Sequence, residues 1–124
     1  MQYHDYHLRG YSVSDFGNTI TLDLVFDYPN RPKIESAIKF SDVVAYKFVH
    51  TGGAIIVDIL QTKLSAISKE LDNELTQWAR QYGLIYYEGN LEICKAKLEE
   101  LGYKAWEICS AVGFGGLIVA KDVK

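Results

Sequence analysis

The chain has 124 residues, 48% hydrophobic and 23% charged, a composition that excludes intrinsic disorder and suffices for one domain, residues 1–124, with its own core. The net charge of −3 argues against a protein that holds nucleic acid through its phosphates, because that contact needs clustered Lys and Arg. No apolar run reaches the roughly 18 residues of a membrane-spanning helix. Neither nucleic acid nor a membrane is therefore an expected partner.

The cysteines and the first residues predict a cytoplasmic location. Cys94 and Cys109 are too few for a disulfide framework, and we interpret both as reduced thiols. Residues 1–7 lack the basic start and apolar centre of a secretory signal peptide. Both features are typical of a protein that stays in a reducing compartment.

The N-terminal half carries the alternation of apolar and polar residues that is typical of β-strands. Residues 3–13 form a strand whose apolar side chains change parity, and a bulge at Arg9-Gly10 would return them to one face. Residues 19–28 alternate strictly, which predicts one face on the core and one face toward water. Two further runs, 34–40 and 43–49, continue the pattern after a break that contains two prolines.

Residues 54–60 are apolar at both parities, as expected of a strand that is covered on both faces. Gly52-Gly53 would form a two-residue turn into this strand, because glycine accepts positive φ angles. The run before the turn, Val43–His50, is then its antiparallel partner. The N-terminal half is therefore predicted to be an antiparallel meander of about five strands.

The middle of the chain changes to three- and four-residue steps, which predicts an amphipathic helix over about residues 63–82. Thr62 or Ser65 would cap its start, and Gly83 would end it. Its buried stripe would consist of Leu64, Ile67, Leu71, Leu75, Trp78, Ala79 and Tyr82. The helix should lie across the dry face of the meander, since both surfaces need cover.

A short strand at residues 84–87 and a second helix over about residues 90–101 are expected next. Asn90 would cap this helix and Gly102 would stop it. Its buried stripe would consist of Leu91, Cys94, Leu98 and Leu101. Residues 103–110 and 117–120 then form a C-terminal β-hairpin around a glycine-rich turn at 113–116. The expected fold class is α+β.

Few residues have the types and spacing of a reaction centre. His4 and His7 have opposite parity on a strand and would point to opposite faces, so we expect no metal site there. Asp58 is the one carboxylate in the apolar run; it is either buried with a raised pKa, as a general base would be, or turned to solvent or a loop. His50 would lie at the far end of the hairpin from Asp58. We predict no catalytic residue and no cofactor.

Aromatic and acidic side chains predict an interaction surface instead. Exposed Tyr and Trp beside carboxylates are typical anchors of protein interfaces, although surface carboxylates can also serve solubility alone. Adjacent tyrosines on a strand point to opposite faces, so one of Tyr86 and Tyr87 is expected at the surface. The predicted partner-binding residues are Asp23, Asp27, Tyr86, Tyr87, Glu88, Glu92 and Trp106.

The first half of the chain resembles small bacterial toxin-immunity proteins of the contact-dependent inhibition or polymorphic-toxin type. The resemblance covers residues 3–60 and rests on three runs: Tyr3-His4-Asp5-Tyr6-His7-Leu8-x-Gly10-Tyr11, Phe40-Ser41-Asp42-Val43-Val44-x-Tyr46-x-Phe48 and Gly53-x-Ile55-Ile56-x-Asp58-Ile59. It implies a single cytosolic domain that binds and neutralises a cognate toxin, often a nuclease.

Three functions are therefore weighed. The first is a non-enzymatic immunity protein that occludes the active site of a toxin, where surface carboxylates would meet the basic groove of a nuclease. The second is a small cytosolic enzyme or ligand-binding domain that uses Asp58 or the region of His4 and His7. The third is a homodimeric structural module joined through a sheet edge or exposed aromatic residues.

Overall fold

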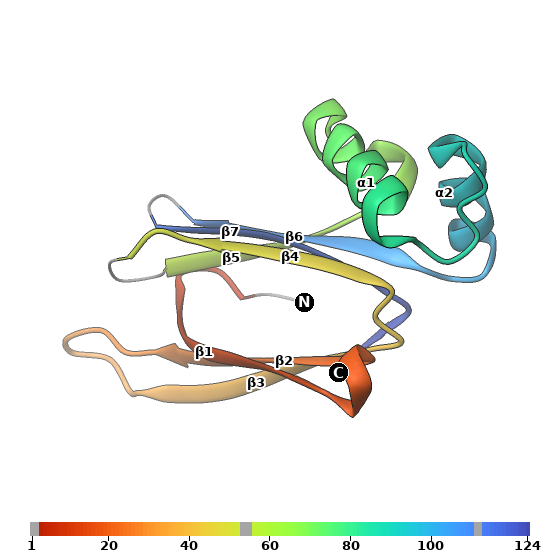
Figure 1. Ribbon diagram of the computed structural model, residues 1–124. Helices are drawn as coiled ribbons and strands as arrows, with labels where there is room; N and C mark the ends of the chain where they lie inside the picture. Colours follow the sequence, from red (N-terminus) through yellow and green to blue (C-terminus); the bar gives the residue numbers. More distant parts are fainter. Residues whose placement is uncertain (1–2, 53–55, 111–112) are drawn as a thin grey trace.

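The computed structural model describes residues 3–52, 56–110 and 113–124 and has the expected α+β fold, with strands first, then helices, then strands (Figure 1). In the described chain the strands are β1 (Tyr6–Ser14), β2 (Thr19–Phe26), β3 (Ile34–Ser41), β4 (Ala45–His50), β5 (Ile56–Thr62), β6 (Lys104–Ser110), β7 (Phe114–Ala120) and β8 (Asp122–Val123). The helices are α1 (Lys69–Tyr82) and α2 (Leu91–Glu100), with short 3-10 turns at Asp15–Gly17 and Leu64–Ala66.

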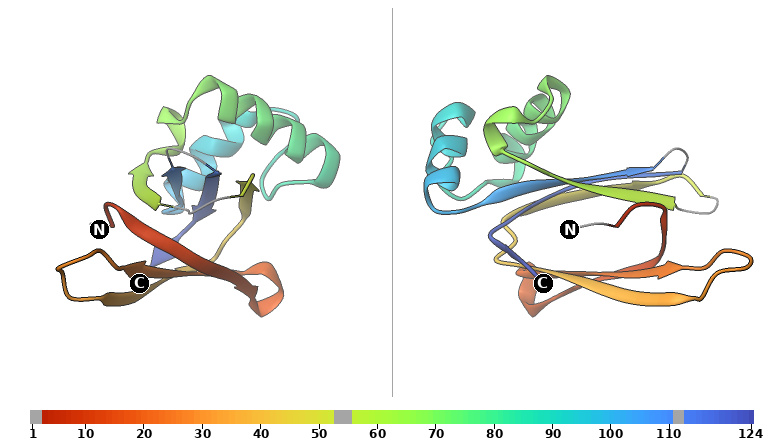
Figure 2. Two further views of the ribbon diagram at one scale, coloured as in Figure 1. Left: turned by 90° about the vertical axis from the view of Figure 1, so that its left-hand side faces the viewer. Right: turned by 180° about the vertical axis from the view of Figure 1, so that it is seen from behind.

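The strands form one antiparallel sheet in the order β4-β7-β6-β5-β1-β2-β3-β8, and this sheet folds over into two layers (Figures 1 and 2). β1 joins the layers: its start pairs with β5, Tyr6 opposite Val57, and the rest pairs with β2 in the other layer. The register shift between Leu8 and Gly10 confirms the predicted bulge. Only Lys121 separates β7 from β8, which pairs with β3 and links the layers again.

The predicted pairing of the fourth and fifth strands is wrong. β4 pairs with β7, and β5 pairs with β6 and β1, so the C-terminal hairpin β6-β7 lies between β5 and β4. Of the five N-terminal strands, only β1, β2 and β3 are neighbours in chain order. Gly52 has a positive φ of 100°, as a turn requires, whereas residues 53–55 lie outside the described chain. A local turn does not fix pairing, because another hairpin can insert between its two strands.

The outer face of β5 is not covered, contrary to the prediction from its apolar run. Val57 and Ile59 are buried, whereas Ile56 and Leu60 are 39% and 53% exposed. The helices pack on the outer faces of β6 and β7, where Ala105, Leu117 and Val119 are buried beneath them. β5 is therefore buried on one face only, and Ile56 and Leu60 on its other face remain exposed to water.

The main core lies between the two layers, where β2 contributes Ile20, Leu22 and Leu24, each 0% exposed, as strict alternation predicted. Trp106 belongs to this core: it is 1% exposed, and its ring meets the edge of Phe40 with centroids 5.2 Å apart. The prediction of Trp106 as a partner-binding residue is therefore wrong. The register of β6 directs residue 106 between the layers and residue 105 toward the helices.

Helix α1 begins later than predicted. The Ser68 side chain accepts a hydrogen bond from the Leu71 N–H at 3.2 Å, which makes Ser68 the cap instead of Thr62 or Ser65. Residues 64–66 form a separate 3-10 turn that buries Leu64. Gly83, with a φ of 88°, ends α1 as predicted.

Helix α2 and its link to α1 rest on one predicted cap and one buried ion pair. Asn90 accepts from the Ile93 N–H at 3.1 Å, which confirms the cap. Lys95, 3% exposed, donates to Asp72 of α1 at 2.7 Å and lies 3.2 Å from Glu92. Burial works to lower the pKa of Lys95, but the two carboxylates outweigh it and the pKa is raised. The charged lysine thus ties the two helices together.

Two further segments differ from the prediction. Residues 84–87 form a turn and not a strand, because Tyr86 has a left-handed φ of 65° and the Tyr87 N–H donates to the Leu84 carbonyl at 3.0 Å. The strand β7 begins at Phe114, so Gly116 lies inside the sheet opposite Phe48 and not in a turn. No helix in the described ranges combines the length and the apolar character needed to cross a membrane.

Candidate functional sites

The connection between α1 and α2, with the residues that flank it, exposes four large apolar side chains, and we call residues 82–93 the helical corner (Figure 1). Tyr82 is 77% exposed and Ile93 68%, while Ile85 and Tyr86 are 48% and 44% exposed. A large apolar side chain exposed alone is ordinary, but four within twelve positions of one segment make this segment a candidate for contact with a partner.

Of the predicted partner-binding residues, Tyr86, Glu88 and Glu92 lie exposed on the helical corner. Tyr87 is half-buried and packs against the core beneath the helices. The turn explains this division: the left-handed Tyr86 reverses the chain, so that its ring points outward and Tyr87 points inward. Glu92 also contacts the buried Lys95.

A groove with both polar and aromatic lining residues continues the helical corner along the edge of the sheet. It has a volume of about 490 Å³ and lies between β4 and α1, where Tyr46, Trp78 and Tyr82 line it. β4 is the last strand on its side of the sheet. The ammonium of Lys47 lies 5.4 Å from the centroid of the Trp78 ring and 3.5 Å from Glu74, so it fixes the indole at the groove wall.

Asp23 and Asp27 lie on the β1-β2-β3 layer, whereas the helices lie beyond the other layer (Figures 1 and 2). Asp23 accepts two hydrogen bonds from Arg9, at 2.9 and 3.0 Å, and Glu35 accepts a third from Arg9 at 3.3 Å. These bonds lower the pKa of both carboxyl groups. Asp27 is exposed just after β2. The structure therefore does not bring these two aspartates together with the helical corner.

The contacts of Arg9 with Asp23 and Glu35 predict how the stability of the fold depends on pH. Because the folded pKa values of Asp23 and Glu35 lie below their ordinary 3.8 and 4.5, the stabilisation is full above pH 4.5 and is lost as the pH falls through the folded values. Arg9→Gln should therefore shrink the difference in urea midpoint between pH 6 and pH 3. Arg31→Gln, an exposed arginine in the loop after β2, is the matched control. An equal change in both variants would contradict the prediction.

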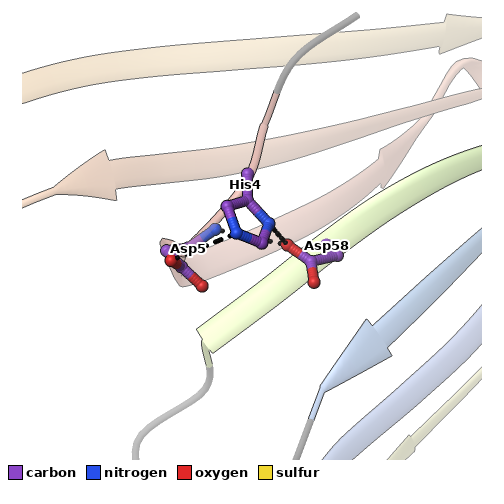
Figure 3. Close-up of side chains that lie close together, drawn as sticks. All are labelled: His4, Asp5 and Asp58. Carbon is purple, nitrogen blue, oxygen red and sulfur yellow. Dashed lines mark hydrogen bonds and ion pairs between the residues drawn. The ribbon is translucent and has the colours of Figure 1, made fainter.

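The second candidate site joins the N-terminal segment to β5 (Figure 3). His4 Nδ1 lies 2.6 Å from Asp58 Oδ1, and His4 Nε2 lies 3.4 Å from Asp5 Oδ2. The Asp5 N–H also donates to Asp58 Oδ1 at 3.3 Å. The side chains of His4, Asp5 and Asp58 are 76%, 56% and 42% exposed. These groups meet at the surface and not inside a cavity.

The predictions for His7 and Asp58 can be compared with their positions around this site. His7 does not converge with His4: it is half-buried on β1 and its ring lies 5.1 Å from that of Tyr28. Asp58 faces solvent and the N-terminal segment, the second of its two predicted environments. Cys109 lies opposite Asp58 on β6, and partial burial, with Glu107 and Asp58 nearby, raises the pKa of its thiol.

Sequence reasoning missed several of these residues. It placed Tyr82 on the buried stripe of the first helix, but the last turn of α1 lies beyond β4 in the left view of Figure 2. Ile93 carried a usable signal, since it falls off the stripe of Leu91, Cys94 and Leu98 and so belongs on the wet face. The contact of His4 with Asp58 spans 54 residues and leaves no local pattern.

Comparisons with protein-family models, with curated proteins and with solved structures find no match to this chain.

Proposed function

We propose that this chain is a non-enzymatic immunity protein that binds a cognate bacterial toxin in the cytoplasm and occludes its active site. The observation that carries the proposal is the apolar surface of the helical corner, with Tyr82 77% and Ile93 68% exposed beside acidic residues. Apolar and aromatic anchors of this kind supply most of the binding free energy at protein interfaces.

The charges of the helical corner support a basic partner. Glu88 and Glu92 lie between the apolar anchors in the sequence, and Glu92 is 74% exposed. A nuclease needs Lys and Arg in its substrate groove to hold phosphates, and such a groove is attracted to carboxylates. Complementary charge would speed association and set orientation, while the anchors exclude water.

The experiment uses the product of the gene beside this chain's gene, which the proposal expects to be a toxin, produced together with the chain in a sensitive host. The unaltered chain should restore growth. Tyr82→Ala combined with Ile93→Ala should weaken the affinity of the purified pair about 30-fold or more, since the loss of even one anchor residue of about 2 kcal/mol has that effect. Glu88→Lys should slow association in a salt-dependent manner.

The matched control is Phe16→Ala combined with Ile34→Ala, because both side chains are exposed and apolar but lie on the β1-β2-β3 layer. This pair should bind as the unaltered chain does. If the variant with both Tyr82→Ala and Ile93→Ala binds as tightly as the unaltered chain, the helical corner is not the binding surface. A neighbouring product whose toxicity the chain does not relieve would refute the function itself.

A further inference from the structure

We propose that His4, Asp5 and Asp58 form a binding site for a divalent transition-metal ion, with Zn²⁺ as the best match (Figure 3). One ligand atom from each residue can be chosen so that all three lie within 4.8 Å of one another. The proposal does not rest on the proposed function, because these residues lie on the N-terminal segment and β5, away from the helical corner.

The donor set favours Zn²⁺ over Mg²⁺ or Ca²⁺. An imidazole nitrogen with two carboxylate oxygens is a set that Zn²⁺ accepts in tetrahedral sites, whereas the harder ions prefer oxygen alone. Bond lengths of about 2.0–2.2 Å place neighbouring ligand atoms roughly 3.5 Å apart around a tetrahedral ion. One ligand atom from each residue already lies within 4.8 Å of the other two. His4 now turns Nδ1 to Asp58 at 2.6 Å and Nε2 to Asp5 at 3.4 Å, so the ring must rotate for one nitrogen to share an ion with both carboxylates. Exposed side chains can make the remaining adjustment, and water would take the fourth position.

The backbone holds the ligands together in advance. Tyr6 pairs with Val57, which places the residues just before β1 beside Asp58. Asp5 has a left-handed φ of 60°, so the consecutive side chains of His4 and Asp5 can lie next to each other, which a regular strand forbids. The Asp5 N–H bond to Asp58 fixes the approach. Only side-chain motion is then needed when an ion binds.

The chain suits a direct test, since it contains three histidines whose ring signals can be followed separately by NMR. The full chain with Cys109→Ser, which removes an exposed thiol that could bind Zn²⁺ itself, is titrated with zinc chloride. One equivalent should shift the His4 ring signals and leave those of His7 and His50 in place. Magnesium chloride at the same concentration should shift none of them.

Calorimetry with variants completes the test. His4→Ala and Asp58→Asn should each weaken zinc binding at least tenfold, and so should Asp5→Asn, since asparagine tolerates the left-handed backbone. His50→Ala and Asp27→Asn remove an exposed histidine and an exposed carboxylate elsewhere, and they should leave the affinity within twofold.

Two results would overturn the proposal. One is zinc binding that His4→Ala does not weaken; the other is no shift of the His4 ring at millimolar zinc. Either would leave the contact between His4 and Asp58 as an ordinary surface hydrogen bond. Neither would bear on toxin binding, which is measured with the variants of the helical corner.

Discussion

Trp106→Ala is expected to lower the free energy of unfolding by about 3–5 kcal/mol, the range for removal of a large aromatic side chain from a core. The indole is 1% exposed between the two layers and packs edge-on against Phe40. Whole domains are stable by only about 5–15 kcal/mol, so this loss should leave a measurable fraction of the molecules unfolded. Urea denaturation followed by circular dichroism gives the value.

Trp106→Phe is the control. No hydrogen-bond partner of the Trp106 indole N–H is present among the described residues, so phenylalanine keeps much of the packing and breaks no bond there. We expect this variant to lose about 1–2 kcal/mol through the reduced volume alone. An alanine variant as stable as the unaltered chain would contradict the burial of the indole between the two layers.

Gly116→Ala is expected to lower the free energy of unfolding by about 1–3 kcal/mol, because it overpacks a closed contact. A Cβ at this position would lie 2.5 Å from Cδ1 of Phe48 and 3.1 Å from the Lys47 carbonyl oxygen. The Phe48 ring has little room to retreat, since its centroid lies 4.6 Å from that of Tyr11 and 5.4 Å from that of Phe114. The methyl group must therefore displace either this aromatic cluster or the pairing of β4 with β7.

Gly115→Ala is the matched control, one residue away on the same strand. Nothing lies within 4 Å of a Cβ at Gly115, so we expect its stability to stay within about 0.5 kcal/mol of the unaltered chain. Urea midpoints of the two variants provide the comparison. Equal midpoints would mean that the contact between Gly116 and Phe48 does not limit the packing of β4 against β7.

Local patterns in the sequence determined the elements and many of their faces. The alternation of Ile20, Leu22 and Leu24 predicted their common burial, and the parity change after Leu8 predicted the bulge at Gly10. The caps at Asn90 and Gly83 followed from residue type alone, because side-chain capping and positive φ are properties of single residues.

The helical corner was predictable only in part. Glu88, Glu92 and one of the two adjacent tyrosines were expected at the surface; both glutamates and Tyr86 lie there. Tyr82 was not, because periodicity shows which face of a helix is apolar but not how far the helix extends beyond the sheet. Trp106 was wrongly named as a partner-binding residue. Its strand has apolar residues at both odd and even positions, and such a pattern does not show which face packs between the layers and which packs under the helices.

Only the tertiary structure decided which strands pair and which distant side chains meet. β6 and β7 lie between β5 and β4, and His4 meets Asp58 across 54 residues. Residue spacing encodes the period and face of one element, which depend on neighbours a few positions away. Pairing depends on whether a distant segment buries more apolar surface than a near one after the cost of closing the longer loop, and that balance exists only in the assembled chain.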